Sequence, residues 1–145
     1  MGDSDRRDLR ERAFELAKRV FLLFPRLARA GPAHAYVARQ LMSATASIGA
    51  NLEEGAAASS RRDMAHKYSI ALRESRESRY WARLGATDAN WAATLTPIGQ
   101  ESQEFVAMLT TAVKKLRRPA DAAVPLRAKR LDRARRSRSR SRQRV

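Results

Sequence analysis

The sequence contains no cysteine and only two histidines. Without cysteine, neither a disulfide framework nor a thiolate zinc site is available, and a reducing cytoplasm is the simplest compartment. His34 and His66 lie in different segments, and neither belongs to a metal-ligand spacing such as HExxH or the ExxH pair of di-iron bundles. The sequence also lacks a glycine-rich phosphate loop and a nucleophile motif. These absences predict a protein that is not an enzyme and has no cofactor.

Four glutamates are the remaining source of catalytic or metal-binding groups. Glu53 and Glu54 lie on one predicted helix, and Glu74 and Glu77 lie on the next. Carboxylates from two helices can meet around a metal or in acid/base chemistry. Arginine is abundant on the same helix as Glu74 and Glu77, however, and ion pairing is the interpretation we favour.

Long apolar runs are missing as well. The N-terminal segment lacks the continuous apolar stretch of a signal peptide. No part of the chain approaches the roughly 18 apolar residues that a membrane-spanning helix needs. We therefore expect a soluble, cytoplasmic protein.

Acidic residues are scarce relative to basic ones, because 15 Asp or Glu oppose 30 Lys or Arg and the formal net charge is +15. The excess is concentrated at one end. Residues 117–145 contain 12 Lys or Arg and 2 Asp, a net charge of +10, whereas residues 1–116 contain 18 basic and 13 acidic residues. The composition changes near residue 119, so we predict a helical domain over residues 5–118 and a disordered, basic Arg/Ser-rich tail over residues 119–145.

Strand-like alternation is absent, and apolar or small residues instead recur at spacings of three and four, as in amphipathic helices. Four segments show this spacing: Leu9, Ala13, Leu16, Val20, Leu23 and Leu27; Leu41, Ala44, Ile48 and Leu52; Met64, Tyr68, Ala71, Ser75, Ser78 and Ala82; and Ile98, Ser102, Phe105, Leu109, Ala112 and Leu116. Four amphipathic helices with short connections predict an all-α fold, an antiparallel up-and-down four-helix bundle.

Capping residues and helix breakers predict where the first three helices begin and end. The first helix is expected to start with Ser4 or Asp5 as its N-cap and to reach about residue 30, with a kink or an early end at Pro25. The second is expected over about residues 33–57. The third is expected over about residues 61–86, with Ser60 in position to cap it.

Two further helix ends are predicted from glycine and proline. Gly55 is expected to stop the second helix through a left-handed conformation, which glycine reaches at little steric cost. Thr96 and Pro97 have the sequence of an N-cap and a first helical residue, which leaves residues 85–95 as a connection before the fourth helix.

Polar residues follow the apolar stripe of the second predicted helix. Ser47, Asn51 and Glu54 recur at helical spacing, and burying such groups without partners costs roughly 1–3 kcal/mol each. One interpretation is a hydrogen-bonded network with the third helix, or at a subunit interface, that fixes helix register. The other is a binding site for a ligand or partner. The residues assigned to this interface or structural network are Gln40, Ser47, Asn51, Glu54, Arg73, Glu74, Glu77, Tyr80 and Trp81.

The third predicted helix carries apolar surface beyond its core stripe. Tyr80, Trp81 and Leu84 lie off that stripe, and surplus apolar surface usually marks an interface. We therefore predict self-association. On the same helix, Arg73 and Glu77 have the i,i+4 spacing of an ion pair.

The tail, which ends RARRSRSRSRQRV, is either a stretch of solvated charge or a phosphate-binding segment, and we favour phosphate binding. Its charge predicts binding to RNA or DNA that weakens as salt rises and does not depend on base sequence. An acidic protein or a membrane surface is the alternative target, and residues 120–136 are a candidate basic helix on an anionic surface. The candidate nucleic-acid-binding residues are Arg61, Arg62, Arg117, Arg118, Arg127, Lys129, Arg130, Arg133, Arg135, Arg136, Arg138 and Arg140.

Two motifs give residues 8–117, approximately, a resemblance to a known family. SIxxNxxEG in the second predicted helix is followed by IALxExxExxYW in the third. The combination resembles the bacterial four-helix-bundle proteins first noticed as products of intervening sequences within large-subunit ribosomal RNA genes. The matching positions are Gln40, Leu41, Ala44, Ser47, Ile48, Asn51, Glu54, Gly55, Ser60, Arg61, Tyr68, Ala71, Glu74, Glu77, Tyr80, Trp81 and Leu84.

This resemblance implies an up-and-down bundle that assembles into a ring-like homopentamer and whose biochemical role is largely unknown. A related bundle in diversity-generating retroelements is a basic pentamer that partners a reverse transcriptase and its RNA. That similarity of fold suggests a reverse transcriptase or another operon-encoded protein as a candidate partner. The long Arg/Ser tail departs from the short C-terminus usual in the family.

These observations predict a non-enzymatic homo-oligomer, a pentamer by resemblance, that binds RNA, DNA or a ribonucleoprotein through its basic surface and tail. We do not expect a membrane partner. The alternative is an oligomeric scaffold whose main partner is protein and whose tail has no nucleic-acid function.

Overall fold

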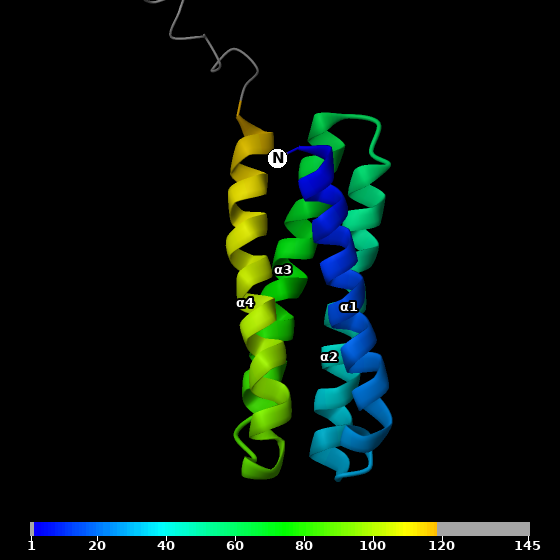
Figure 1. The fold of residues 1–145 in the computed structure, drawn as a ribbon, viewed down its shortest axis with the longest axis vertical. Helices are drawn as coiled ribbons and strands as arrows, with labels where there is room; N and C mark the ends of the chain where they lie inside the picture. The colour runs from blue at the N-terminus through cyan, green and yellow to red at the C-terminus, as the bar shows by residue number, and fades with distance from the viewer. Residues whose placement is uncertain (1, 119–145) are drawn as a thin grey trace, which may run out of the picture.

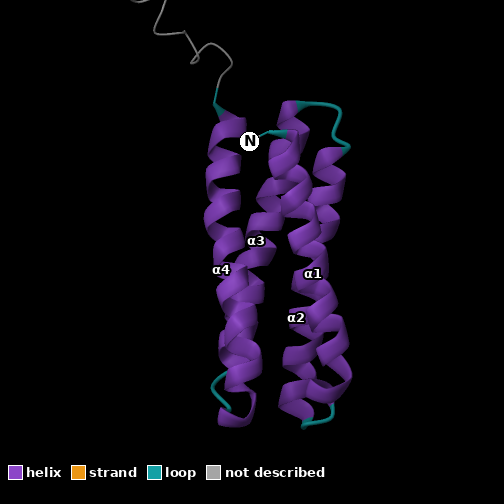
Figure 2. Cartoon of the chain, viewed as in Figure 1, coloured by secondary structure: helices purple, strands orange, loops and turns teal. Residues whose placement is uncertain are grey.

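Four helices joined by short turns make up the part of the chain that the computed structural model describes, residues 2–118 (Figure 1, Figure 2). They are α1 (Asp3–Ala28), α2 (Pro32–Ala56), α3 (Arg61–Gly85) and α4 (Ala89–Arg117). Successive helices run antiparallel, which confirms the predicted all-α, up-and-down arrangement. The predicted tail, residues 119–145, lies outside the described residues.

The core lies where the predicted apolar stripes meet. Leu16, Leu41, Tyr68 and Phe105, one from each helix, are fully buried. Extensive packing joins α1 to α2, α2 to α3 and α3 to α4, whereas α1 and α4 approach each other closely at few points. The bundle therefore has three tight interfaces and one looser seam, between α1 and α4. None of the four described helices is both long and apolar enough to cross a membrane.

The N-terminus of α3 follows the sequence prediction, and that of α1 does not. Ser60 caps α3, because its hydroxyl accepts a hydrogen bond from the backbone N–H of Asp63. In contrast, α1 begins at Asp3 with Gly2 as its N-cap, and the carboxylate of Asp5 accepts a hydrogen bond from the Gly2 N–H at 2.9 Å. Pro25 does not end α1, which continues to Ala28.

The predicted role of Gly55 is wrong. Gly55 is helical and buried within α2, and the described glycine with a positive φ is Gly31, in the turn before α2. A Cβ placed on Gly55 would lie only 2.8 Å from the Tyr68 ring. Glycine at this position therefore lets the tyrosine of α3 pack directly against the α2 backbone.

The predicted connection over residues 85–95 is also wrong, because most of it is helix. Asp88 caps α4 by accepting a hydrogen bond from the backbone N–H of Asn90 at 2.9 Å. Pro97 lies inside α4 rather than at its start. Leu95 is fully buried and extends the apolar face upstream of Ile98, so core packing keeps the helix continuous despite the missing proline N–H.

Candidate functional site

The polar residues Ser47, Asn51 and Glu54 on α2 make most of their hydrogen bonds within their own helix. The amide of Asn51 donates to the carbonyl oxygen of Ser47 at 2.9 Å and lies 3.3 Å from the Ser47 hydroxyl. The contact that crosses to α3 is an ion pair between Glu54 and Lys67. The predicted network between the two helices is therefore limited to Glu54. Gln40 is half-buried near the middle of α2.

A buried polar pair that the sequence interpretation missed joins α3 to α4. The hydroxyl oxygens of Ser78 and Ser102 lie 2.7 Å apart, and both residues are fully buried. Ser102 also donates to the carbonyl oxygen of Ile98 at 2.8 Å, so Ser78 donates the shared hydrogen bond. The signal available in the sequence was a serine on the apolar stripe of each helix.

The charged residues of α3 pair differently from the prediction. Arg73 lies 3.8 Å from the carboxylate of Glu74, and the i,i+4 pair with Glu77 is not formed. The Glu74 side chain is only 16% exposed. This burial, together with the neighbouring charge of Glu77, raises the pKa of Glu74, and Arg73 acts in the opposite direction. Within residues 2–118, no group of three or more His, Asp or Glu is placed to hold a metal ion.

Aromatic side chains gather between the start of α2 and the end of α3. Trp81 contacts Tyr36 and Tyr80 edge to face, with ring centroids 5.5 and 5.1 Å away. Tyr36, Tyr80 and Leu84 are 48%, 57% and 43% exposed, and they line a groove of about 560 Å³. Tyr80 is exposed, whereas Trp81 is half-buried and packs against the edge of the core. We call Tyr36, Tyr80, Trp81 and Leu84 the aromatic patch.

A second apolar area lies on α1. Phe14, Phe21 and Leu22 are each more than 60% exposed. Phe14 and Phe21 are seven residues apart, so they share one face of the helix. We call these three residues the phenylalanine patch.

The two histidines have different surroundings. Nε2 of His34 lies 2.9 Å from a carboxylate oxygen of Asp88, the cap of α4. The pKa of Asp88 is lowered mainly by the Asn90 backbone N–H and further by His34. His34 therefore helps to hold the α1–α2 end of the bundle to the start of α4. His66 is exposed on α3 among basic residues.

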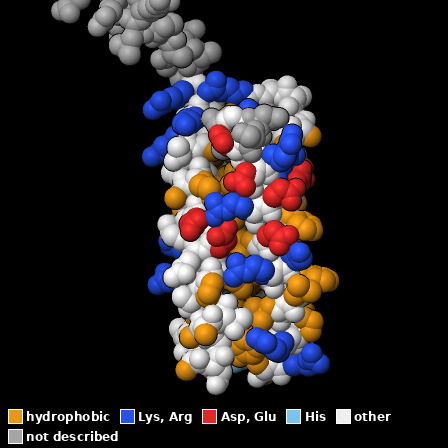
Figure 3. All heavy atoms as spheres, viewed as in Figure 1, with side chains coloured by type: hydrophobic (Ala, Val, Ile, Leu, Met, Phe, Trp, Pro, Cys, Tyr) orange, Lys and Arg blue, Asp and Glu red, His pale blue; other side chains and the backbone are white. Residues whose placement is uncertain are grey.

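Those basic residues cluster at the end of the bundle where α3 begins and α4 ends. Figure 3 shows Lys and Arg side chains around the end of the molecule from which the chain continues beyond residue 118. The exposed members, which we call the basic end, are Arg61, Arg62, Lys114, Lys115, Arg117 and Arg118. A groove of about 530 Å³ lies between the start of α3 and the end of α4.

Two predicted nucleic-acid-binding arginines of the basic end also have structural contacts. The guanidinium of Arg61 donates to the carbonyl oxygens of Leu116 and Lys115, the latter contact being very short. Arg61 therefore binds carbonyls in the last turn of α4, where the Lys115 carbonyl also accepts a hydrogen bond from the Arg118 backbone N–H. Arg117 donates to the hydroxyl of Ser69 at 2.9 Å.

Of the other predicted nucleic-acid-binding residues, Arg62 and Arg118 are exposed at the basic end. Lys114 and Lys115 were missed, although basic residues in the last turn of a helix are a recognisable signal. The remaining candidates lie outside the described residues: Arg127, Lys129, Arg130, Arg133, Arg135, Arg136, Arg138 and Arg140.

Comparison with known proteins identifies the family. The family described as 23S rRNA-intervening sequence protein matches residues 6–115. A solved structure of a protein of unknown function, from the S23 ribosomal protein family of Bacteroides thetaiotaomicron, is 28% identical and superposes with a TM-score of 0.67. The match covers 75% of this chain and 97% of that one. No curated protein matches. With the family matched over residues 6–115, across all four helices, the chain belongs to the 23S rRNA-intervening sequence protein family.

Proposed function

We propose that the protein is a non-enzymatic homo-oligomer, a pentamer, that binds nucleic acid or a ribonucleoprotein through its basic end and tail. The observation that carries the proposal is the position of the basic end. The six cations of the basic end surround the point where the chain leaves α4. The tail beyond that point adds ten Lys or Arg against two Asp.

This arrangement supports binding to phosphate rather than to a protein partner of mixed charge. The groove at the basic end is lined by Arg61, Arg62, His66 and Arg117, with no carboxylate among its lining residues. Cations gathered around a groove whose lining contains no carboxylate attract the phosphate backbone and release its counterions on binding. Base-edge readout is not expected, so affinity should be largely independent of sequence.

Self-association is supported by the aromatic patch and the phenylalanine patch. A closed ring requires a head-to-tail contact between two different surfaces of each subunit. The aromatic patch lies on α2 and α3, and the phenylalanine patch lies on α1, so each subunit offers two distinct apolar surfaces. Light scattering should give five times the chain mass of 16.3 kDa. Tyr80→Asp should reduce that mass, whereas Arg76→Asp, on the same helix, should leave it unchanged.

Binding of a generic single-stranded RNA across a salt series tests the nucleic-acid part. Each cation that contacts phosphate contributes about −0.7 to the slope of log affinity against log salt. If five tail cations bind, a chain ending at Arg118 should lose about 3.5 of that slope. The full-length chain with Arg62→Ala and Lys114→Ala should also bind more weakly than the matched control with Arg73→Ala and Arg76→Ala. Salt-insensitive binding, or no binding, by the full-length chain would overturn the proposal.

The rival function is an oligomeric scaffold for a protein partner, and the exposed aromatic patch favours it. In that case the full-length chain still forms an oligomer but does not bind RNA at physiological salt. The light-scattering and RNA measurements together therefore separate the two functions.

A further inference from the structure

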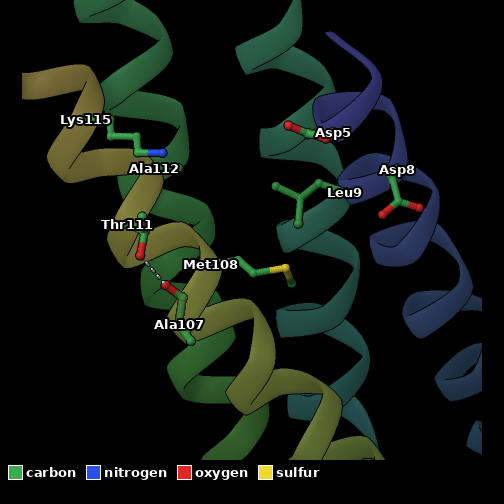
Figure 4. Close-up of a pocket in the computed structure, with 8 residues that line it drawn as sticks. All are labelled: Asp5, Asp8, Leu9, Ala107, Met108, Thr111, Ala112 and Lys115. Carbon is green, nitrogen blue, oxygen red and sulfur yellow. Dashed lines mark hydrogen bonds between the residues drawn. The ribbon is translucent and has the colours of Figure 1, made fainter. Parts of the chain in front are cut away.

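A groove of about 540 Å³ follows the seam between α1 and α4 (Figure 4). Leu9 of α1 and Met108 of α4 point toward each other across it, and Ala112 continues this apolar floor. Leu9 is almost fully buried, whereas Met108 is only partly covered. Met108 and the exposed Ala107 therefore supply the apolar surface that the groove leaves open to solvent.

Arg12 closes the other end of this groove. Its guanidinium pairs with Glu101 at 2.9 Å and Glu104 at 2.6 Å, and it lies 5.7 Å from the centre of the Phe105 ring. These contacts join α1 to α4 one turn beyond Met108. The groove thus ends at a fixed bridge and stays open toward residue 118.

Carboxylates border the groove on the α1 side. Asp5 and Asp8 line it, and neither pairs with a Lys, Arg or His side chain among residues 2–118. Figure 3 shows acidic side chains gathered on this face, around a single basic group. Counting Asp5, Asp8, Glu101 and Glu104 against Arg12 and Lys115 gives a local net charge of −2, on a chain of formal net charge +15.

The sequence supplies an occupant with matching properties. Residues 119–145 carry ten Lys or Arg and two Asp, a net charge of +8. The segment 120–136 also contains Val124, Leu126 and Leu131 between its basic residues. It begins five residues after Lys115 in the sequence, and Lys115 lines the open end of the groove. A partner that offers both apolar groups and cations suits an apolar floor with an acidic border.

We propose that residues 120–136 fold back and dock in the α1–α4 groove of their own chain. Val124 and Leu131, seven residues apart and so on one face of a helix, cover the open apolar surface at Met108 and Ala107, and the neighbouring cations face Asp5 and Asp8. The segment is long enough, because 17 residues span about 25 Å even at the short rise of a helix, whereas the groove measures about 16 Å along α4 from Lys115 to Glu104.

Covalent attachment makes weak contacts sufficient for this docking. A short flexible connection gives an effective concentration in the millimolar range, so an intrinsic affinity of that order already populates the docked state. Docking does not rest on the proposed function. If the proposed function also holds, tail cations that face Asp5 and Asp8 are unavailable to phosphate, and nucleic acid competes with the groove for the tail.

Labelled methionine methyl groups and one spin label test the docking. Because the chain has no cysteine, Ala128→Cys provides a single attachment site for a nitroxide within residues 120–136 and leaves Val124 and Leu131 in place. NMR then measures the broadening of the Met108 methyl signal in the full-length protein without nucleic acid. Met42, on α2, is the internal control and also reports that the bundle is folded. We expect strong broadening of Met108, little broadening of Met42, and loss of the difference at about 0.5 M salt, where the Debye length is only ~4 Å.

Charge-reversal variants with equal changes in net charge make the test specific. Asp8→Lys should strongly reduce the broadening of Met108, whereas Glu77→Lys, on α3 and away from the groove, should preserve it; Asp5 is kept because its carboxylate caps α1. Equal broadening of Met108 and Met42 in the parent chain would overturn the proposal. So would broadening seen only when the label and the isotope are on different copies, because a neighbouring copy's tail would then fill the groove. None of these outcomes bears on RNA binding, which is measured separately.

Discussion

Two glycines of α2, Gly49 and Gly55, should respond in opposite ways to the same substitution. Alanine in place of glycine within a helix contributes up to about 1 kcal/mol, because glycine loses more backbone freedom on folding. A Cβ on Gly49 would lie 3.9 Å from the Cβ of Ala13, an ordinary van der Waals distance. Gly49→Ala should therefore raise the free energy of unfolding by about 1 kcal/mol.

At Gly55 the same methyl group meets a ring that cannot move aside. The new Cβ would lie 2.8 and 2.9 Å from two carbons of Tyr68, which is fully buried. Overpacking of this kind costs about 1–3 kcal/mol, against a gain in helix propensity of about 1 kcal/mol. Gly55→Ala should therefore range from neutral to destabilising by about 2 kcal/mol. The difference between the two variants, about 1–3 kcal/mol, measures the steric clash alone.

Urea unfolding followed by far-UV circular dichroism measures both values. The protein concentration must be held constant, because the stability of a self-associating protein depends on it. The control is Gly55→Ala on a Tyr68→Leu background, where the clash is removed and alanine should stabilise the helix. If Gly55→Ala is as stable as Gly49→Ala, or still destabilises the Tyr68→Leu background, close packing against Tyr68 is not the reason for this glycine.

Two other substitutions have unusual expected signs. Tyr68→Phe removes a buried hydroxyl that has no hydrogen-bond partner among residues 2–118. Because burying such a group costs about 1–3 kcal/mol, urea unfolding should show no loss of stability. A loss above about 1 kcal/mol would contradict this expectation. Burial and Glu77 raise the pKa of Glu74, so ionised Glu74 opposes folding. This penalty is fully present above the folded-state pKa, decreases as the pH falls through it, and is gone below the unfolded-state pKa. Glu74→Gln should therefore stabilise the protein at neutral pH and lose that advantage in acid, whereas an advantage independent of pH would contradict the burial argument.

Helix spacing predicted the architecture because burial follows the helical repeat locally. Leu16, Leu41, Tyr68 and Phe105 were all on predicted stripes, and all are fully buried. Helical spacing identifies the residues that share one face of a helix, and a helical bundle buries one face of each of its helices. Most of the fold was accessible from the sequence for this reason.

Helix ends were predicted less well where packing outweighs local preference. Pro97 and Gly55 both have strong local tendencies to begin or end a helix, yet each lies within one. Leu95 extends the core upstream of Pro97, and Tyr68 occupies the space that a side chain on Gly55 would fill. Both causes are contacts with other helices, which local sequence signals do not contain.

Polar contacts show the same limit. The spacing of Ser47 and Asn51 correctly placed them together, but it could not show that Asn51 would bond to its own helix. Recognising the Ser78–Ser102 pair required the relative rotation of α3 and α4. The exposure of Tyr80 was predictable, because it lies off the core stripe. The α1–α4 groove was not predictable, because how closely α1 and α4 pack depends on all four helices.

The order of the helices in space has a consequence for how the chain folds. Every extensive interface joins helices that are consecutive in the sequence, and the turns between them are short. Closing such short loops costs little entropy, and topologies dominated by nearby contacts fold in microseconds to milliseconds. Each hairpin can form without waiting for α1 to meet α4. During synthesis, α1, α2 and α3 can therefore assemble one after another while α4 is still in the ribosome, with the α1–α4 seam closing last.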